Sequence, residues 1–171
     1  MAISTFNNYR KNHERRAPKW YDNDDELRLL NYTDGVEEFE DAPLAVGQDD
    51  MVPSTENPDP DKKFLWVIRE CDVPFILEQA TITPALESKV CKHTNLTGGN
   101  DAYCGGEVWF VSESRLILNG GSGRYPPNDE IEFSAVVESF KNAGYEVWSM
   151  GWDEGIDGPA RVLKGDPPWD M

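Results

Sequence analysis

The chain has 171 residues, the size of one domain, and its 32 acidic against 16 basic residues give a formal net charge of −16. Hydrophobic residues make up 39% of the chain and no apolar run exceeds five residues, which excludes a membrane span of roughly 20 apolar residues. Three cysteines without a CxxC pair disfavour a disulfide scaffold and a zinc ribbon, and the N-terminus lacks the apolar core of a secretory signal. We therefore expect a cytoplasmic protein with no metal site.

The N-terminal third predicts an arm rather than a folded unit. Residues 1–20 carry five bases and one acid, whereas residues 21–61 carry fourteen acids against Arg28 alone. Five proline and glycine residues interrupt the second half of this acidic stretch. We therefore divide the chain into an N-terminal arm of residues 1–61, basic over 1–20 and acidic over 21–61, and a globular domain of residues 62–171.

The arm has two interpretations. Its high charge and low apolar content are typical of a disordered leader, which cannot bury enough surface to offset its ordering entropy. Aromatic and aliphatic residues nevertheless alternate with the acids, which favours attachment to the arm's own domain, to a neighbouring copy or to a partner. An acidic surface attracts basic proteins and repels nucleic acid. The residues expected to contact a partner are Trp20, Tyr21, Asp24, Asp25, Glu26, Glu37, Glu38, Phe39 and Glu40.

Three segments predict helical structure and seven predict strands. The helical segments are a short helix over residues 24–32 capped by Asn23 or Asp24, a turn over 83–88 that Pro84 favours, and a main helix over 129–143. In the main helix, five apolar residues at helical spacing form one stripe, Asn128 can cap the start and Gly144 ends it. Runs of β-forming residues predict strands over 64–71, 74–79, 88–93, 107–111, 115–119, 145–152 and 160–163.

This order of elements predicts the fold class. Two pairs of consecutive strands read as hairpins, 64–71 with 74–79 and 107–111 with 115–119, because only short turns separate them. We expect an α+β domain: a mainly antiparallel β-sheet covered by one main α-helix (129–143), with an extended acidic N-terminal arm.

Polar and glycine residues gather in three loops, which we name loop A (92–99), loop B (103–107) and loop C (119–125). Each lies at a predicted strand end, where a sheet can hold loops in place and glycine lets backbone N–H groups approach an anion. His93, Glu107 and Tyr125 are candidate catalytic residues, because these side chains can transfer protons. The candidate ligand-binding residues are Thr94, Asn95, Gly98, Gly99, Gly105, Gly106, Asn119, Gly121, Ser122, Gly123 and Arg124, the last as a fork for phosphate or carboxylate.

A structural interpretation of the same loops stays open. Glycine-rich loops are most often turns, and GGSG in loop C matches neither a P-loop nor a dinucleotide fingerprint, so no cofactor is expected. A residue such as His93 is more often a hydrogen-bonded structural histidine, and a glutamate that opens a strand, such as Glu107, is usually solvated.

The order KHTNLTGG, GGE, a hairpin and SGRYPP resembles the pattern HSSFLAGG…AAGE…SGHYRP of plant IQM-type calmodulin-binding proteins and some bacterial hypothetical proteins. It covers residues 64–145, and the matching positions are His93, Leu96, Gly98, Gly99, Glu107, Ser122, Gly123, Tyr125 and Pro127. Thr94 and Asn95 stand in place of serines, Gly106 of alanine and Arg124 of the second histidine. The chain has no IQ motif, so calmodulin binding does not transfer. The resemblance implies a shared pocket rather than a reaction.

Two function classes follow, with a third interpretation beside them. The leading hypothesis is an intracellular interaction protein, such as an inhibitor or viral accessory protein, whose acidic surface and arm engage a basic partner or a larger assembly. The alternative is a small enzyme or ligand-binding domain for a phosphorylated or nucleotide-like molecule, using His93, Glu107, Arg124 and Tyr125, with ADP-ribosyl transfer as one possible reaction. A third is an assembly subunit whose N-terminal segment inserts into a neighbour.

Overall fold

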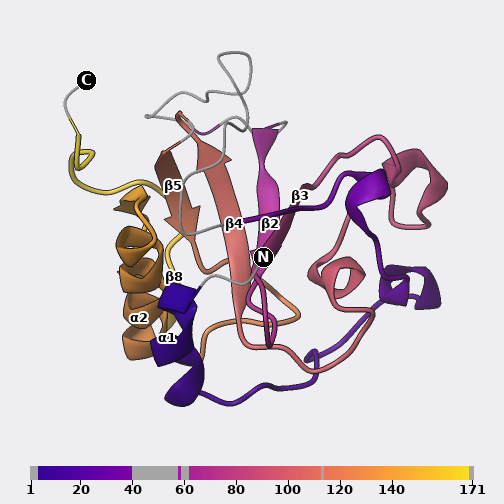
Figure 1. Cartoon of the computed structure of the whole chain (residues 1–171), viewed down its shortest axis with the longest axis horizontal. Helices are drawn as coiled ribbons and strands as arrows, with labels where there is room; N and C mark the ends of the chain where they lie inside the picture. The colour runs from indigo at the N-terminus through magenta and orange to yellow at the C-terminus, as the bar shows by residue number, and fades with distance from the viewer. Residues whose placement is uncertain (1–3, 40–57, 59–61, 113, 170–171) are drawn as a thin grey trace.

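The structure is a computed structural model that describes residues 4–39, 58, 62–112 and 114–169 (Figure 1). Two α-helices are described, α1 (Asn7–Lys11) and α2 (Glu130–Asn142). The strands are β1 (Glu37–Glu38), β2 (Phe64–Val67), β3 (Pro74–Leu77), β4 (Gly105–Phe110), β5 (Arg115–Asn119), β6 (Glu146–Ser149), β7 (Trp152–Asp153) and β8 (Gly158–Pro159). Short 3₁₀ helices complete the set: η1 (Ser4–Phe6), η2 (Asp24–Leu27), η3 (Tyr32–Asp34), η6 (Thr83–Ala85) and η7 (His93–Leu96).

Six strands form one sheet in the order β1-β3-β2-β4-β5-β6, and β7 and β8 form a separate pair. Every neighbouring pair in the large sheet is antiparallel except β5 and β6, which are parallel because α2 crosses between them. The sheet is therefore mainly antiparallel, and one main helix packs on it. The expected α+β class is confirmed.

Side chains alternate between the two faces of the sheet, so each strand contributes to two cores. Phe64 and Trp66 of β2 belong to the core beneath the helices, where they join Phe133 and Phe140 of α2. Figure 1 shows α1 and α2 side by side on that face. Successive aromatic rings make edge contacts, such as Trp66 with Phe140 at 5.6 Å between centroids.

Loops rather than helices cover the opposite face. Leu65 and Val67 of β2 pack there against Leu96 and Tyr125. The segment that carries Leu96 belongs to the lobe on the right of Figure 1. A third cluster joins Trp109, Ile117 and Trp148 of the sheet to the C-terminal segment through Met150, Ala160 and Trp169. Because loops cover this face, their polar side chains lie directly over the sheet.

Residues 4–39 belong to the same body as the domain, which corrects the expected arm over its described part. Phe6 and Phe39 are fully buried in the core beneath α2, and β1 pairs with β3. Phe6 packs edge-on against Phe140 at 5.0 Å, and Phe39 lies 4.4 Å from Phe75. Apolar side chains spaced widely among charges thus supply enough burial to fix this segment. Glu40 and most of the remaining arm lie outside the described residues.

Three local predictions also need correction. Residues 88–93 form no strand, because Lys89 has a left-handed φ of 60° and η7 begins at His93. Residues 160–163 form no strand either, and the last strand is β8, two residues earlier. Asp129 rather than Asn128 caps α2, since its side chain accepts the N–H of Glu132 at 2.8 Å.

The main helix, the turn over 83–85 and most strand positions are confirmed, whereas the helix expected over 24–32 is only a turn over 24–27, since Arg28 is already extended. The turn behind Asn23 is η2, with Asn23 accepting the N–H of Glu26 at 3.0 Å, and residues 83–85 form η6 with Pro84 in its first turn. Among the residues that the structure describes, no helix is long and apolar enough to cross a membrane.

Candidate functional site

Hydrogen bonds hold the three loops together. The hydroxyls of Thr97 in loop A and Tyr125 in loop C lie 2.7 Å apart, and Tyr125 also donates to the carbonyl of Asn100 at 2.8 Å. The N–H of Gly105 in loop B donates to the carbonyl of Tyr125 at 2.8 Å. The loops therefore converge on Tyr125, which is almost fully buried.

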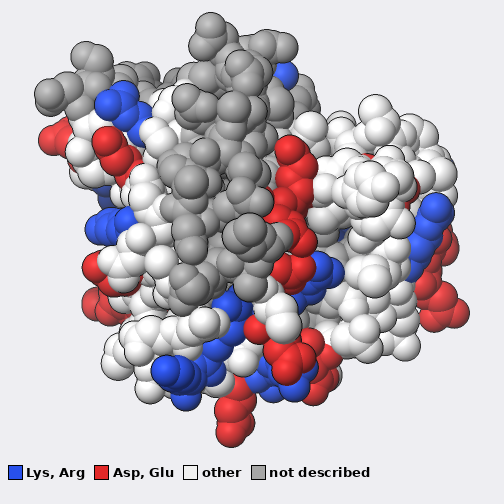
Figure 2. Space-filling model, viewed as in Figure 1, with Lys and Arg blue, Asp and Glu red and all other residues white. Residues whose placement is uncertain are grey.

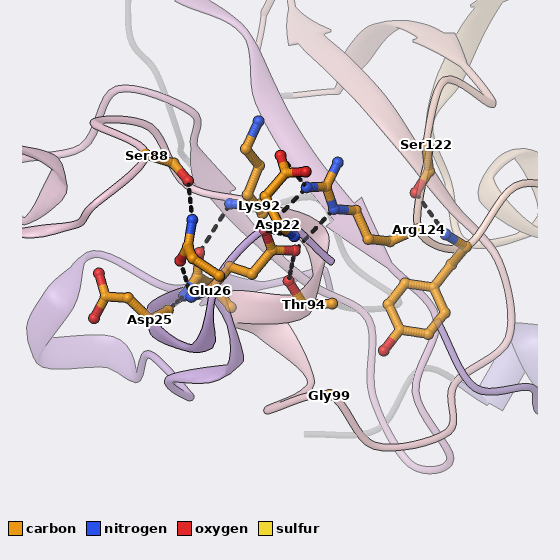
Figure 3. Close-up of polar contacts among 12 residues, drawn as sticks. Asp22, Asp25, Glu26, Ser88, Lys92, Thr94, Gly99, Ser122 and Arg124 are labelled. Carbon is orange, nitrogen blue, oxygen red and sulfur yellow. Dashed lines mark hydrogen bonds and ion pairs between the residues drawn. The ribbon is translucent and has the colours of Figure 1, made fainter. Parts of the chain in front are cut away.

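Loops A and C bind a carboxylate, and it is supplied by Glu26 of the chain itself (Figure 3). Arg124 donates from Nε to Oε1 at 2.9 Å and from Nη2 to Oε2 at 3.0 Å. The hydroxyl of Thr94 donates to Oε1 at 3.0 Å, and the backbone N–H of Asp22 donates to Oε2 at 2.9 Å. Glu26 is 2% exposed and Arg124 is 6% exposed, so this is a buried, forked ion pair.

The hydrogen bonds decide the charge of Glu26. Burial raises the pKa of its carboxyl, but donors from Arg124, the Asp22 backbone and Thr94 outweigh burial and hold the pKa below its ordinary value. Glu26 is therefore ionised at neutral pH, and the pair with Arg124 is a pair of full charges.

Trp20 closes the outer side of this pair. Its ring lies over the Arg124 guanidinium at 3.9 Å, a cation–π contact, while 48% of the Trp20 surface remains exposed. Asp22 adds a weaker contact to Arg124 at 3.4 Å, with its own carboxylate mostly in solvent. Three residues from one short segment thus surround a single guanidinium.

Loop A holds the rest of this segment through its backbone. The Asn95 amide donates to the carbonyl of Arg28 at 2.9 Å, and the Asn95 carbonyl accepts the N–H of Leu30 at 2.9 Å. Gly99 has a φ of +81°, and a Cβ there would lie 2.9 Å from the side chain of Leu27. Loops A and C therefore have an occupant, residues 20–30 of the same chain, which we name the docked segment.

Asn119 and Gly121 belong instead to a cluster around Glu107, whereas a Cβ on Gly98 would meet Leu29 and one on Gly123 would meet Trp20, both in the docked segment. Lys63 approaches one Glu107 oxygen at 3.1 Å, and Arg161 approaches the other at 3.6 Å. The Asn119 side chain donates to Glu107 at 3.0 Å and accepts the N–H groups of Glu107 and Gly121. Gly105 and Gly106 are strand residues of β4, where a Cβ would meet backbone atoms within 2.6 Å. These residues shape the end of the sheet, so the loops that meet at Tyr125 present two polar clusters, one around Glu26 and one around Glu107.

Each candidate catalytic residue has a structural hydrogen bond. His93 Nε2 lies 2.8 Å from the carbonyl of Gly106, and burial lowers the pKa of His93 to about 4, so the ring is neutral and Nε2–H donates. Glu107 is ion-paired with Lys63, and Tyr125 bonds Thr97 and Asn100. Ser122 serves the turn of loop C, since its hydroxyl accepts the N–H of Tyr125 at 2.9 Å. Catalysis by His93, Glu107 and Tyr125 stays a prediction, and these contacts favour the structural interpretation.

The expected partner-binding residues divide into exposed and buried ones. Trp20, Tyr21, Asp24 and Glu37 are exposed, and Asp25 and Glu38 are partly exposed. Glu26 and Phe39 are buried, which corrects their assignment: the first neutralises Arg124 and the second packs among the rings of the core.

Sequence reasoning missed a groove beside the docked segment. Its volume is about 520 Å³, and its lining is Leu29, Leu30, Asn31, Tyr32, Val36, Glu37, Glu38 and Arg69. Two large hydrophobic side chains of this lining face solvent: Leu29 is 53% exposed and Tyr32 is 82% exposed. The one available signal was the interleaving of apolar residues with acids over residues 27–39. It did not show which of these side chains face solvent.

Over the parts of the chain that the structure describes, no group of three or more His, Cys, Asp or Glu residues is placed to hold a metal ion. Comparison of the chain with protein-family models, curated proteins and solved structures finds no match. The resemblance to the IQM-type pattern therefore stays a prediction.

Proposed function

We propose that the protein is a protein–protein interaction module that binds a basic segment of a partner in the 29–38 groove, defined by the lining residues given above. The observation that carries the proposal is the combination of exposed Leu29 and Tyr32 with acids along one groove. Aromatic and aliphatic side chains that remain exposed in a free protein are typical of interaction surfaces.

The charge of the groove specifies a basic occupant. Glu37 and Glu38 bring two carboxylates to the lining, and its one cation, Arg69, is already engaged by Asp72 at 2.5 Å and by the nearby charge of Glu38. The whole chain adds a net charge of −16, which speeds the approach of a basic partner. On the face seen in Figure 2, Asp and Glu side chains form a column beside the lobe on the right.

A lysine or arginine suits this lining, because its alkyl stem can pack on Leu29 and Tyr32 while its charge reaches a glutamate.

The groove is already formed in the free protein. Leu30, at 3% exposure, anchors its floor, and the N–H of Leu30 donates to loop A. At the other end, β1 fixes Glu37 and Glu38 by pairing with β3. A partner therefore does not have to order this segment, which lowers the entropic cost of binding.

The test uses a fluorescent peptide of about twelve residues that alternates lysine and leucine. We expect the double variant L29A/Y32A to bind this peptide about tenfold more weakly than the wild type, measured by fluorescence anisotropy, because two apolar contacts are lost. The matched control is I131A/I156A, which removes two other large side chains that are 78% and 66% exposed, and it should bind within about twofold of the wild type.

Two outcomes would overturn the proposal. One is an equal loss of affinity in both double variants, which would mean that the peptide binds the acidic surface without using the groove. The other is a wild-type dimer, seen by light scattering, that L29A/Y32A abolishes, because a second copy would then be the occupant.

A further inference from the structure

The carboxylate of Glu26 is held as a bound anion would be held. Two donors on Arg124 form a fork, and Thr94 on a different loop adds a hydroxyl to the same oxygen that Nε contacts. These residues come from positions 94 and 124, whereas the carboxylate comes from a segment about seventy or more positions earlier. The donor set is therefore a receptor built by the domain, and the docked segment supplies the ligand.

Loops A and C carry one donor beyond those that contact the Glu26 carboxylate. The Arg124 fork and the Thr94 hydroxyl already satisfy both oxygens of Glu26. The Asn95 amide also faces the docked segment, where it donates to the carbonyls of Arg28 at 2.9 Å and Asp25 at 3.3 Å. With that segment removed, a guanidinium, a hydroxyl and an amide are left without acceptors. A phosphate has an additional oxygen and a higher charge, so it matches this set better than a carboxylate does.

The docked segment is held mostly by polar contacts. Within it only Glu26 and Leu30 are buried, and Trp20, Tyr21, Asp22 and Asp24 are exposed. Its helical structure is the single 3₁₀ turn of η2. Release of the docked segment would expose few apolar side chains. An anion that replaces the Glu26 carboxylate therefore has to offset only a small free energy of apolar exposure.

We propose that Arg124, Thr94 and Asn95 form a binding site for the phosphate group of a small molecule, and that the docked segment fills this site in cis with Glu26 as the phosphate mimic. The docked segment is then autoinhibitory for that site. The three donors do not line the 29–38 groove, so L29A/Y32A leaves them in place, although the docked segment contributes Leu29 and Leu30 to the lining of that groove.

The first experiment measures melting temperatures with inorganic phosphate as the probe, at about 20 mM and with chloride at equal ionic strength as the reference. E26A should gain on the order of 3 °C from phosphate, because phosphate satisfies the donors that the variant leaves unpaired. Wild type and D24A should gain less than about 1 °C. D24A is the matched control, since it removes one exposed carboxylate from the same turn. Acetate should stabilise E26A less than phosphate does.

Two further variants test whether the effect of phosphate depends on Arg124 and on the lost acceptor. A measurement on the wild type covers the case in which E26A does not fold. E26A/R124A should gain nothing from phosphate, and E26Q, which keeps an acceptor for Arg124, should gain less than E26A. In the wild type, phosphate should speed hydrogen exchange at the amides of Asp22, Glu26 and Leu30, which bond within the docked segment or to loop A. The proposal is overturned if folded E26A gains no more than D24A. It is equally overturned if E26A does not fold and exchange in the wild type is unchanged by phosphate.

Discussion

The two halves of the N-terminal segment are attached to the domain by different forces. Residues 4–16 insert Phe6 and Tyr9 into the core under α2, where both are at most 2% exposed. Residues 20–30 instead lie over loops A and C, with Glu26 as the main buried contact and Trp20 half in solvent. The first half is part of the interior, and the second is a polar ligand of the surface loops.

This difference predicts different responses to the surroundings. Burial of apolar rings does not depend on pH or on competing ions, whereas an ion pair depends on both. Arg16 does bind Glu132 at 3.2 Å in the first half, and the Tyr9 hydroxyl donates to the same carboxylate at 2.6 Å, but the fully buried ring of Phe6 holds that half without any charge. We therefore expect the first half to remain attached under conditions that release the second. The predictions below separate the two halves, from the largest effect to the smallest.

The largest effect is expected in the first half. F6A should lower the free energy of unfolding by about 4 kcal/mol, because it empties a fully buried site beside Phe140. Urea denaturation followed by tryptophan fluorescence measures it. I131A, on the exposed side of α2, should stay within about 0.5 kcal/mol of the wild type. A small loss in F6A would mean that residues 4–16 are peripheral to the core.

In the second half, E26A should cost about 3 kcal/mol, because it leaves the Arg124 charge buried without its partner. The double variant E26L/R124M should cost less than E26A, since no unpaired charge remains. The same denaturation experiment gives both values. Additive losses, with the double variant costing more than either single change, would contradict the assignment of this contact as an ion pair.

The chain has two histidines: His13 lies in the first half, and His93 lies in loop A, on which the second half docks. Burial holds the pKa of His93 at about 4, below its ordinary 6.5. Between these values the unfolded chain binds a proton that the folded chain does not, so stability falls as pH falls through this window, by about 3 kcal/mol. H93Q should remove this part of the pH dependence. H13Q is the control, because His13 is half-buried and stacks on Tyr9 in the first region. An equal change of slope in both variants would refute the assignment.

Sequence reasoning identified the elements whose signal is local. The apolar stripe of residues 131–140 gave the main helix, and the run Phe64–Val67 gave a central strand, because periodicity and β-branched or aromatic content are properties of short windows. The strand predicted over 88–93 was wrong because a short window does not contain tertiary contacts. Its alternation suggests a strand, but the left-handed Lys89 and the bond from Cys91 N–H to the Glu78 carbonyl are set by tertiary packing.

The sequence predicted the receptor half of the candidate site but not the carboxylate that fills it. Arg124 and Thr94 could be recognised as anion-binding residues from their loops, whereas their ligand lies 98 and 68 positions away, and no local pattern connects Glu26 to them. Phe39 was similarly hidden among acids, although it packs against four aromatic rings of the core. Long-range pairing decides which side of a charged segment faces inward, and the composition of that segment does not contain this information.

The most direct test of the partner-binding account is a titration of ¹⁵N-labelled protein with the lysine–leucine peptide, followed by amide chemical shifts. The account predicts that the shifted amides concentrate in residues 29–38 and at Arg69, while residues 4–16 stay unchanged. Shifts spread evenly over acidic residues throughout the chain, or centred on another surface, would contradict it.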